Sequence, residues 1–490
     1  MGSRKPRVAI FPSAGLGHLI PFAELAIRLS DHHGLSVSFI SCKWMFSPRL
    51  MASYSERIAS SGLDITFVQL PEVEIDGAEH MKIETHISKL LEKSKDSVVS
   101  ALRSLLDSAP PISAFITDFS CSTMFDVAAE LGIPTYVFFT STASLLSFML
   151  SFPKLVSEIP ISFKDTEFPI EIPGLPPIAG TDLPPPVQDR SNEAFYWAVQ
   201  HCSCLWKVRG ILINTFEELE PETIKALVEG KISNTTEADR VPRFYPVGPV
   251  ISSSPLEYND KHVEDGRADC LKWLDNQPPS SVLFVSFGSG ASLPSAQVTE
   301  LAVGLEASGH RFLWVLRSLS SSFLSIEETE LSQVLPEGFE NRTRDRGLVV
   351  ASWAPQIPVL SHPSTGGFIS HCGWNSTLES ISHGMPIICW PLFAEQRMNR
   401  ILLVNKLKVG IAAKMESDGF VGREEVERAV RELMEGGDGR RVRARMRELK
   451  VKAVSALEEG GSSYKAMAAA VSEWTTNANA ENSVAIIPHI

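Results

Sequence analysis

Short apolar runs alternate with amphipathic stretches along the whole chain. Five runs in the first half are almost continuously apolar, which is typical of strands in a parallel sheet covered by helices on both faces. These runs are Val8–Phe11, Ser36–Ser41, Ile65–Leu70, Ala114–Thr117 and Tyr136–Phe139. Amphipathic patterns at Pro21–Ser30 and Ser97–Leu106 predict helices between them. The first half is therefore predicted to be a doubly wound α/β domain.

The same alternation begins again in the second half. Its predicted strands are Val282–Phe287, Phe312–Leu316, Leu348–Ala351, Phe368–Ser370 and Ile387–Cys389. Its predicted helices include Ala296–Ala307, Thr377–Ser382 and Arg423–Met434. Two successive series of strands and helices predict an α/β protein with two Rossmann-like domains.

A polar, turn-rich stretch with few apolar residues marks the break between the two series. We expect an N-terminal domain at 1–250, a linker at 251–269 and a C-terminal domain at 270–460. Residues 461–490 are expected to form a C-terminal helix, which could pack back on the N-terminal domain, and a tail. The tail should be loose from Thr475 onward, because that stretch is mostly polar.

Charge and composition exclude several classes of partner. The net charge of −13 disfavours a nucleic acid or an anionic membrane. The run Val8–Phe11 is too short for a secretory signal, and Gly132–Phe152 is broken by Pro134, so no membrane insertion is expected. Seven cysteines without paired spacing predict reduced thiols, no metal site and a cytoplasmic protein.

The stretch from Trp353 to Gln396 contains the strongest chemical pattern. Gly366–Ser370 predicts a strand, His371–Gly373 a tight turn, and Asn375-Ser376 the start of a helix. Such a helix start offers free backbone N–H groups and the positive end of the helix dipole, so it predicts an anion-binding site. His371 adds a hydrogen-bond donor beside it.

Simpler interpretations of these residues exist when each is taken alone. Ser376 and Glu379 could form a capping box, in which Glu379 reaches back to the first amides of the helix. Trp353 and Trp374 could be core residues.

The loop after the first strand is rich in glycine but lacks a dinucleotide fingerprint. Gly15-Leu16-Gly17 is followed by His18, so the third glycine of the motif is missing and a dehydrogenase is disfavoured. His18 lies between a predicted strand and a helix, at the sheet edge where α/β proteins usually form sites. Asp118 ends another predicted strand. Taken alone, His18 could be structural and Asp118 a helix cap.

Taken together, these residues resemble a known family. The block Trp353–Gln396 resembles, over its full length and without a gap, the C-terminal signature of plant family-1 UDP-glycosyltransferases. The resemblance extends to His18, Phe284–Ser289 and Asn214–Glu220, and so covers nearly the whole chain. It implies the GT-B fold, in which two Rossmann-like domains face each other across the active-site cleft. It also implies a UDP-sugar as co-substrate, no metal or other cofactor, and a monomer.

The resemblance assigns the nucleotide contacts. It implies that Trp353 stacks on uracil, that the backbone at Gln356 holds the base edge, and that Glu379 accepts both ribose hydroxyls. The residues expected at the diphosphate are His371, Asn375, Ser376 and Ser289.

The sugar contacts follow from the same resemblance. They are expected from Trp374, Glu395 and Gln396, because a carboxylate beside an amide can accept from and donate to adjacent hydroxyls. A glutamine at the last position goes with glucose in the family, which favours UDP-glucose as donor. Thr140, after the strand Tyr136–Phe139, matches a hydroxyl that touches the sugar in some relatives.

The resemblance makes His18 the general base and Asp118 the carboxylate that orients it. His18 would take the acceptor proton while the acceptor oxygen attacks the anomeric carbon opposite UDP, which inverts the donor into a β-glucoside. Helix amides, His371 and Ser289 would meet the diphosphate charge. Phenols, with a pKa of about 10, suit a base with a pKa of about 6.5 better than alkyl alcohols do.

The acceptor is the least determined part. Val187–Arg190 and Leu271–Asp275 resemble phenol glucosyltransferases of the hydroquinone glucosyltransferase type. Phe119–Thr123 replaces their Leu-Phe-Gly-Thr-Asp beside the expected acceptor pocket, and Arg400 replaces a small residue. Small phenols, phenylpropanoids and flavonoids are therefore all candidate acceptors. Transfer to an aromatic carbon is the main alternative, followed by a non-catalytic nucleotide-sugar binding protein and a retaining GT-B enzyme.

Overall fold

A computed structural model describes residues 5–45, 48–77, 80–108, 110, 112–232, 241–252, 269–290, 292–317, 331–351 and 353–484. The chain divides into two units: unit 1 is Met1–Ile251 with Ser455–Ile490, and unit 2 is Ser252–Val454. The linker expected at 251–269 lies, except for its ends, outside the described residues. Unit 2 ends at Val454, before the boundary expected at 460.

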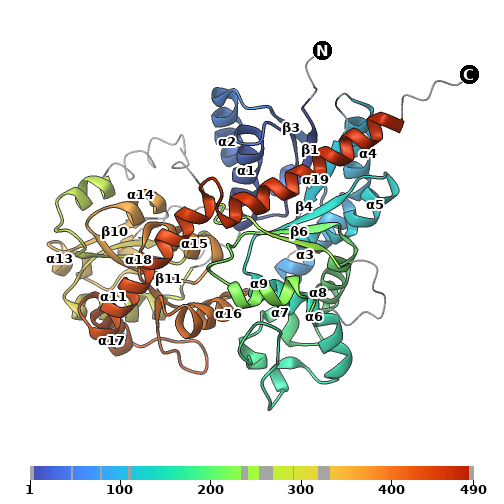
Figure 1. Cartoon of the computed structure of the whole chain (residues 1–490). Helices are drawn as coiled ribbons and strands as arrows, with labels where there is room; N and C mark the ends of the chain where they lie inside the picture. Colours follow the sequence, from blue (N-terminus) through green and yellow to red (C-terminus); the bar gives the residue numbers. More distant parts are fainter. Residues whose placement is uncertain are drawn as a thin grey trace, which may run out of the picture. The chain divides into compact units, whose positions relative to one another are not determined.

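Unit 1 contains a seven-stranded parallel sheet with the order β3-β2-β1-β4-β5-β6-β7 (Figure 1). Its strands are β1 (Arg7–Phe11), β2 (Ser36–Cys42), β3 (Ile65–Leu70), β4 (Ile112–Thr117), β5 (Thr135–Phe139), β6 (Gly210–Ile213) and β7 (Arg243–Pro246). The strand order reverses between β1 and β4, which are neighbours although they are distant in sequence. This reversal is the point at which doubly wound sheets bind ligands.

The first five strands match the predicted ones, whereas β6 and β7 were missed. Both have only four residues, and β7 ends in Pro246 at the edge of the sheet, where a missing N–H is tolerated. The helices of unit 1 are α1 (Leu16–Asp31), α2 (Pro48–Ser61), α3 (Ile83–Lys93), α4 (Lys95–Asp107), α5 (Phe125–Glu130), α6 (Ala143–Glu158), α7 (Pro185–Gln188), α8 (Glu193–Cys204) and α9 (Pro221–Val228). A 3-10 helix, η3 (Phe119–Met124), follows β4 directly.

Helix α1 begins at Leu16, so the prediction that it starts at Pro21 was wrong. Pro21 lies inside the helix, in its second turn. Its ring fixes a helical φ, but it removes one hydrogen bond of the helix and crowds the carbonyl one turn earlier. Because α1 begins at Leu16, His18 belongs to the first turn of the helix.

The C-terminal helix α19 (Ser462–Val484) packs on unit 1 (Figure 1). Its Glu473 accepts hydrogen bonds from Arg209, at 2.7 Å, and from Arg243 and Tyr245, at 2.9 and 2.7 Å. The prediction of a loose tail from Thr475 was wrong, because the helix continues to Val484.

Unit 2 contains a six-stranded parallel sheet with the order β10-β9-β8-β11-β12-β13. Its strands are β8 (Val282–Ser286), β9 (Arg311–Leu316), β10 (Gly347–Ala351), β11 (Thr365–Ser370), β12 (Ile387–Cys389) and β13 (Gly410–Ala412). Its helices are α11 (Ser295–Ser308), α12 (Leu331–Val334), α13 (Phe339–Thr343), α14 (Gln356–Ser361), α15 (Trp374–His383), α16 (Gln396–Ile401), α17 (Arg423–Met434) and α18 (Gly437–Leu457), the last of which runs past the unit's end at Val454. The order reverses between β8 and β11, so the predicted second Rossmann-like sheet is present.

Alternate residues of β8 enter two different cores. Leu283 and Val285 join one buried cluster, whereas Val282 and Phe284 join another on the opposite face of the sheet. Both faces are therefore buried, and this explains why the strands are continuously apolar in sequence.

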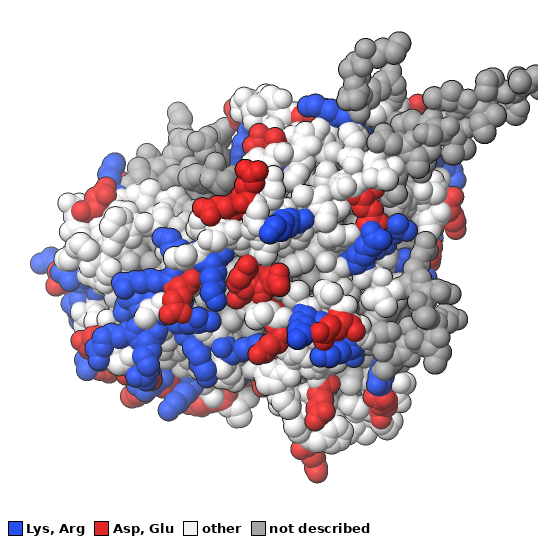
Figure 2. All heavy atoms as spheres, viewed as in Figure 1, with Lys and Arg blue, Asp and Glu red and all other residues white. Residues whose placement is uncertain are grey.

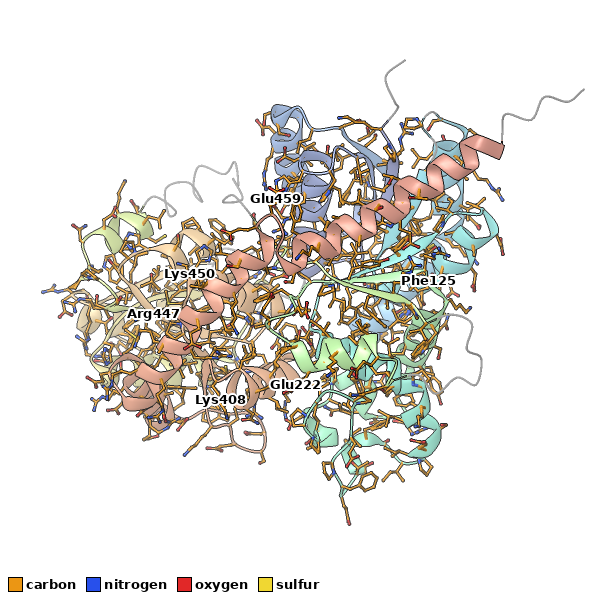
Figure 3. The ribbon with its side chains drawn as sticks, viewed as in Figure 1. Phe125, Glu222, Lys408, Arg447, Lys450 and Glu459 are labelled. Atoms are coloured by element: carbon orange, nitrogen blue, oxygen red, sulfur yellow. The ribbon has the colours of Figure 1, made fainter. Side chains whose placement is uncertain are left out.

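The negative net charge is not spread evenly over the surface. Lys and Arg side chains gather over α17 and α18 (Figure 2). On α18 they are Arg440, Arg441, Arg443, Arg445, Arg447, Lys450 and Lys452. Arg447, Lys450 and Lys408 are exposed on the face shown in Figure 3. The total charge used to exclude anionic partners therefore conceals a local basic surface.

Candidate active site

The structure places His18 and Asp118 at the strand-order reversal of unit 1. Strand β1 pairs with β4, and the last pair in the register is Phe11 with Thr117. Asp118 follows β4 directly, and His18 lies in the first turn of α1, which follows β1. The carboxyl ends of neighbouring parallel strands thus bring together two residues that are 100 positions apart.

The Asp118 carboxylate serves two purposes. Its Oδ2 lies 2.8 Å from Nδ1 of His18, while its Oδ1 accepts hydrogen bonds from the backbone N–H and the hydroxyl of Ser120, at 3.0 and 2.8 Å. Asp118 is therefore also the cap of η3, as the simpler interpretation proposed. Burial would raise the pKa of Asp118, but the charge and hydrogen bond of His18, with the bonds from Ser120, hold it below its usual value.

The hydrogen bonds of His18 determine where its proton lies. An ionised carboxylate can only accept, so Nδ1 of His18 carries the proton and Nε2 is left with its lone pair. Thr140, predicted as a sugar contact, lies with its hydroxyl oxygen 3.3 Å from the same Nδ1. The His18 side chain is 31% exposed and Asp118 is fully buried. An imidazole held in this way by a buried carboxylate can accept a proton at Nε2.

The stretch Asn214–Glu220 supports the segment that carries Thr140. The carboxylate of Glu220 accepts from the backbone N–H groups of Ala143 and Ser144, both at 2.9 Å, and from the hydroxyl of Thr215 at 2.8 Å. These two amides lie at the start of α6, where a negative charge is stabilised by the helix dipole. The motif therefore fixes the turn between β5 and α6, next to His18.

In unit 2, His371 lies between two glycines at the corresponding reversal. Strand β8 leads to Gly288, β11 leads to His371, and β8 pairs with β11. A Cβ atom on Gly288 would lie 2.5 Å from Cε1 of His371, and one on Gly373 would lie 2.3 Å from Nε2. Only glycine lets the backbone approach the imidazole this closely, and Gly288 also has a φ of +77°.

Burial lowers the pKa of His371 to about 4, so the ring is neutral at pH 7. Its Nδ1 atom is buried and has no hydrogen-bond partner among the described residues. The expectation that His371 adds a donor is compatible with a neutral ring, which carries one N–H. A bound anion would gain a hydrogen bond but no full positive charge from it.

The capping-box interpretation of Ser376 and Glu379 was wrong. Helix α15 begins at Trp374, one residue before the predicted start, and its cap is Gly373, with no side-chain capping bond. Glu379 therefore lies beyond the first turn of the helix and cannot reach its first amides. A helix start without a side-chain cap points its first backbone N–H groups outward, which is the arrangement that binds anions in other proteins.

Glu379 instead bonds to Gln356. The amide nitrogen of Gln356, the first residue of α14, donates to Oε2 of Glu379 at 2.5 Å and to the hydroxyl oxygen of Ser376 at 2.9 Å. Burial raises the pKa of Glu379 to about 7, although the bond from Gln356 opposes the shift. This buried carboxyl is suited to accept further hydrogen bonds from a ligand. Gln356 was expected to act through its backbone, so its side-chain role was missed.

The loop after β8 is held by Arg317, which follows β9. The guanidinium of Arg317 donates to the carbonyl oxygens of Gly288 and Ser289. Ser289 itself is exposed at the end of this loop, beside the glycine that contacts His371. Arg317 was not among the predicted residues, although its position at a strand end next to the reversal was a usable signal.

The expected sugar contacts Glu395 and Gln396 lie after β12, at the start of α16. Oε1 of Gln396 accepts from the backbone N–H groups of Leu392 and Phe393, at 2.8 and 3.0 Å, which leaves its amide nitrogen as a donor. Asn399, a residue that sequence analysis missed, donates to the carbonyl oxygen of Cys372 at 2.9 Å and to Glu395 at 3.4 Å. Its amide thus ties α16 to the turn before α15.

The remaining candidates lie at the predicted ends of elements. Trp353 is half-buried just after β10, and Trp374 is buried as the first residue of α15, followed by Asn375. Their contacts with a nucleotide sugar stay predictions. The structure thus brings His18, Asp118 and Thr140 together in unit 1, and groups the other candidates at the strand ends of unit 2.

Two further expectations concern a metal site and a membrane-spanning helix. Within the described residues, no three His, Cys, Asp or Glu side chains are grouped as ligands of a metal ion. In the same part of the chain, no helix combines the length and the apolar character that crossing a membrane requires.

Several known proteins are similar to this chain in sequence and in fold. Residues 267–441 match the family model described as UDP-glucoronosyl and UDP-glucosyl transferase. UDP-glycosyltransferase 72B1 of Arabidopsis thaliana is 42% identical, with 96% of this chain and 97% of the relative covered. Hydroquinone glucosyltransferase of Rauvolfia serpentina is 40% identical, with 96% and 98% covered. The structure of Phytolacca americana UGT2 complexed with UDP-2fluoro-glucose and pterostilbene is similar with a TM-score of 0.83, at 42% identity and with 97% of this chain and 100% of that chain covered.

Proposed function

Because this chain belongs to the plant family-1 UDP-glycosyltransferases and has their GT-B fold, we propose that it transfers glucose from UDP-glucose to a small phenolic acceptor with inversion. The observation that carries the proposal is the 2.8 Å contact between His18 and Asp118 at the strand-order reversal of unit 1. The hydroquinone glucosyltransferase and the pterostilbene complex support a phenolic acceptor, since both proteins are similar over nearly their whole length.

In the proposed reaction, Nε2 of His18 takes the proton of the acceptor hydroxyl. The acceptor oxygen forms a bond to the anomeric carbon as the bond from that carbon to the diphosphate oxygen breaks on the opposite face. The proton ends on His18, the electron pair of the broken bond leaves with UDP, and an α-linked donor becomes a β-glucoside. Asp118 stabilises the imidazolium that forms, because its buried carboxylate stays ionised.

Unit 2 is proposed to bind the nucleotide sugar. The backbone amides at the start of α15 and the N–H of His371 would hold the diphosphate, as donors already in place when its charge increases. Glu379 would accept the ribose hydroxyls, Trp353 would stack on uracil, and Gln396 would donate to a sugar hydroxyl from its amide nitrogen. Trp374, Asn375, Ser376, Glu395 and Ser289 would complete the contacts.

We further propose that the enzyme acts in the cytoplasm as a monomer. All seven of its cysteines are free thiols, and most are buried, which supports a reducing compartment. One chain supplies both the base and the donor site, so the proposed chemistry needs no second copy.

The test is a transfer assay with UDP-glucose and phenols of graded acidity, with products analysed by mass spectrometry and by the NMR coupling of the anomeric proton. His18→Ala should lower turnover by about 10²–10⁴, the usual contribution of a positioned base. The loss should be smallest for acidic nitrophenols, because they need the base least. His32→Ala is the matched control, since His32 is an exposed histidine at the end of the same helix. Near-full turnover in His18→Ala, or an α-configured product, would contradict the mechanism.

A further inference from the structure

A buried histidine in unit 1 belongs to a polar cluster that the proposed chemistry does not use. His201, on α8, is 5% exposed and lies between Ser88 of α3 and Ser122 of η3. Its Nε2 lies 3.0 Å from the hydroxyl oxygen of Ser88, and its Nδ1 lies 2.7 Å from that of Ser122. The Ser88–His201–Ser122 cluster thus joins three elements through two side-chain hydrogen bonds.

The directions of these two bonds follow from Ser88. Its hydroxyl donates to the carbonyl oxygen of Glu84 at 2.8 Å, so its oxygen accepts from the imidazole. Nε2 of His201 therefore carries the proton, and Nδ1 accepts from the hydroxyl of Ser122. Burial lowers the pKa of His201 to about 4, although the charge of Asp118 opposes the shift, so this arrangement persists at neutral pH.

Ser122 lies on the segment that shapes the surroundings of the base. Helix η3 begins after Asp118, which caps it through Ser120, and its first residue is Phe119. The Phe119 ring centroid is 6.4 Å from that of His18 and 6.5 Å from that of His201. The imidazole of His201 also stacks on Trp197, with the ring centroids 5.7 Å apart. A shift of η3 would therefore move both Phe119 and the carboxylate that holds His18.

We propose that the Ser88–His201–Ser122 cluster positions η3, and through Phe119 determines which acceptors can present a hydroxyl to Nε2 of His18. The three residues are positioning residues for acceptor choice and do not touch the reacting atoms. The inference rests on the proposed function, because it names the part of the same site that selects the acceptor. Hydrogen bonds fix one register between packed elements, whereas apolar contacts allow several.

The sequence of η3 agrees with this role. Phe119–Thr123 departs from the Leu-Phe-Gly-Thr-Asp of the phenol glucosyltransferases that the sequence resembles, so the cluster supports a segment in which this chain differs from them. Threonine stands in those proteins where this chain has Ser122, and it keeps the hydroxyl. Ser122→Thr is therefore the natural conservative variant.

The experiment measures kcat and KM for a series of phenols of increasing size, together with KM for UDP-glucose and the melting temperature. His201→Phe and Ser122→Ala should raise KM for the preferred acceptor about tenfold and change the ranking of acceptors, with KM for UDP-glucose unchanged. Ser122→Thr, in contrast to Ser122→Ala, should keep the wild-type ranking of acceptors. Cys202→Ala is the matched control. Cys202 is also buried on α8, but its side chain leaves the helix about 100° away from that of His201.

Two further variants separate the two hydrogen bonds. His201→Asn keeps an acceptor near the position of Nδ1, and His201→Gln keeps a donor near the position of Nε2. The asparagine variant should retain the wild-type ranking better, because only the bond to Ser122 reaches η3. If His201→Phe and Ser122→Ala change the melting temperature but not the ranking, the cluster is only structural and the inference is overturned. A wild type that transfers glucose to no phenol overturns the proposed function itself. If the wild type does transfer glucose to phenols, an unchanged ranking in the variants overturns the inference alone.

Discussion

Gln356 donates a hydrogen bond of 2.5 Å to the carboxyl of Glu379, 23 residues further along the chain. The bond joins the start of α14 to the middle of α15, and Glu379 is only 8% exposed. Burial raises the pKa of Glu379 to about 7. The proposed ribose-binding group therefore changes its charge in the neutral range, which makes its role testable by pH.

Uridine affinity should rise with pH. The ionised form of Glu379 accepts hydroxyl hydrogens more strongly than the protonated form, so binding should strengthen by about tenfold between pH 6 and pH 8. Uridine is the probe because it has no phosphate that titrates in this range. Isothermal titration calorimetry of the wild type and of Glu379→Gln provides the measurement. An equal pH dependence in both proteins would show that Glu379 is not the titrating group.

Removal of the Glu379 carboxyl should weaken UDP-glucose binding. Glu379→Ala deletes a charged acceptor for the ribose hydroxyls, and the expected loss is about 1–3 kcal/mol. Fluorescence titration with UDP-glucose would measure it, with Ser380→Ala, the next residue of the same helix, as control. Normal affinity combined with a lower melting temperature would assign Glu379 a structural role.

Substitutions of Gln396 should separate the role of its amide oxygen from that of its amide nitrogen. Its oxygen holds the backbone at Leu392 and Phe393, whereas its nitrogen is proposed to donate to the sugar. Gln396→Glu keeps an acceptor for the backbone but loses the donor, so it should lower transfer from UDP-glucose with little change in melting temperature. Gln396→Ala should lower both. Gln396→His should move preference from UDP-glucose towards UDP-galactose. Unchanged transfer rates in Gln396→Glu would refute the sugar contact.

Substitutions of Asp118 should distinguish its two roles, as the partner of His18 and as the cap of η3. Asp118→Asn can still cap η3 but no longer offers a charged acceptor to His18, so turnover should fall by less than in His18→Ala, which removes the base itself. Asp118→Ala should in addition destabilise the protein by about 1 kcal/mol, because the cap of η3 is lost. Steady-state kinetics and thermal melting would check both. A double variant with His18→Ala should be little worse than His18→Ala, since residues that act as one unit are not additive.

The two buried neutral histidines should make the protein sensitive to acid. The pKa values of His201 and His371 are lowered to about 4, against about 6.5 in an unfolded chain. The stability that each contributes is present above pH 6.5 and is lost as the pH falls towards 4, by about 2 kcal/mol each between pH 7 and pH 5. Glu379 acts in the opposite sense, because its raised pKa favours the folded state as the pH falls.

The test is therefore a comparison between variants. The urea midpoint of His201→Phe should depend less on pH between 7 and 5 than that of the wild type. His32→Ala is the control, because His32 is largely exposed. An identical pH dependence in wild type and His201→Phe would contradict the buried neutral state.

The sequence alone determined the two Rossmann-like domains. Parallel strands buried on both faces must be apolar throughout, so β1 and β8 are visible without any tertiary information. It also located the strand ends at which His18 and His371 lie. It missed β6, β7 and β13, because three or four residues are too few to show a period and β7 is an edge strand with polar positions.

Only the tertiary structure decided which residues meet. His18 and Asp118 come together because β1 and β4 are neighbours, and that order depends on how the strands pack rather than on local pattern. Local pattern favoured a capping box at Glu379. In the structure the helix begins earlier, at Trp374, and the carboxyl of Glu379 accepts a hydrogen bond from Gln356. The segment expected to be a loose tail continues α19, whose Glu473 pairs with Arg209 and Arg243 from distant parts of unit 1. A sequence carries periodicity and propensity over a few turns, whereas partners brought together by the folded chain are chosen by the packing of distant elements.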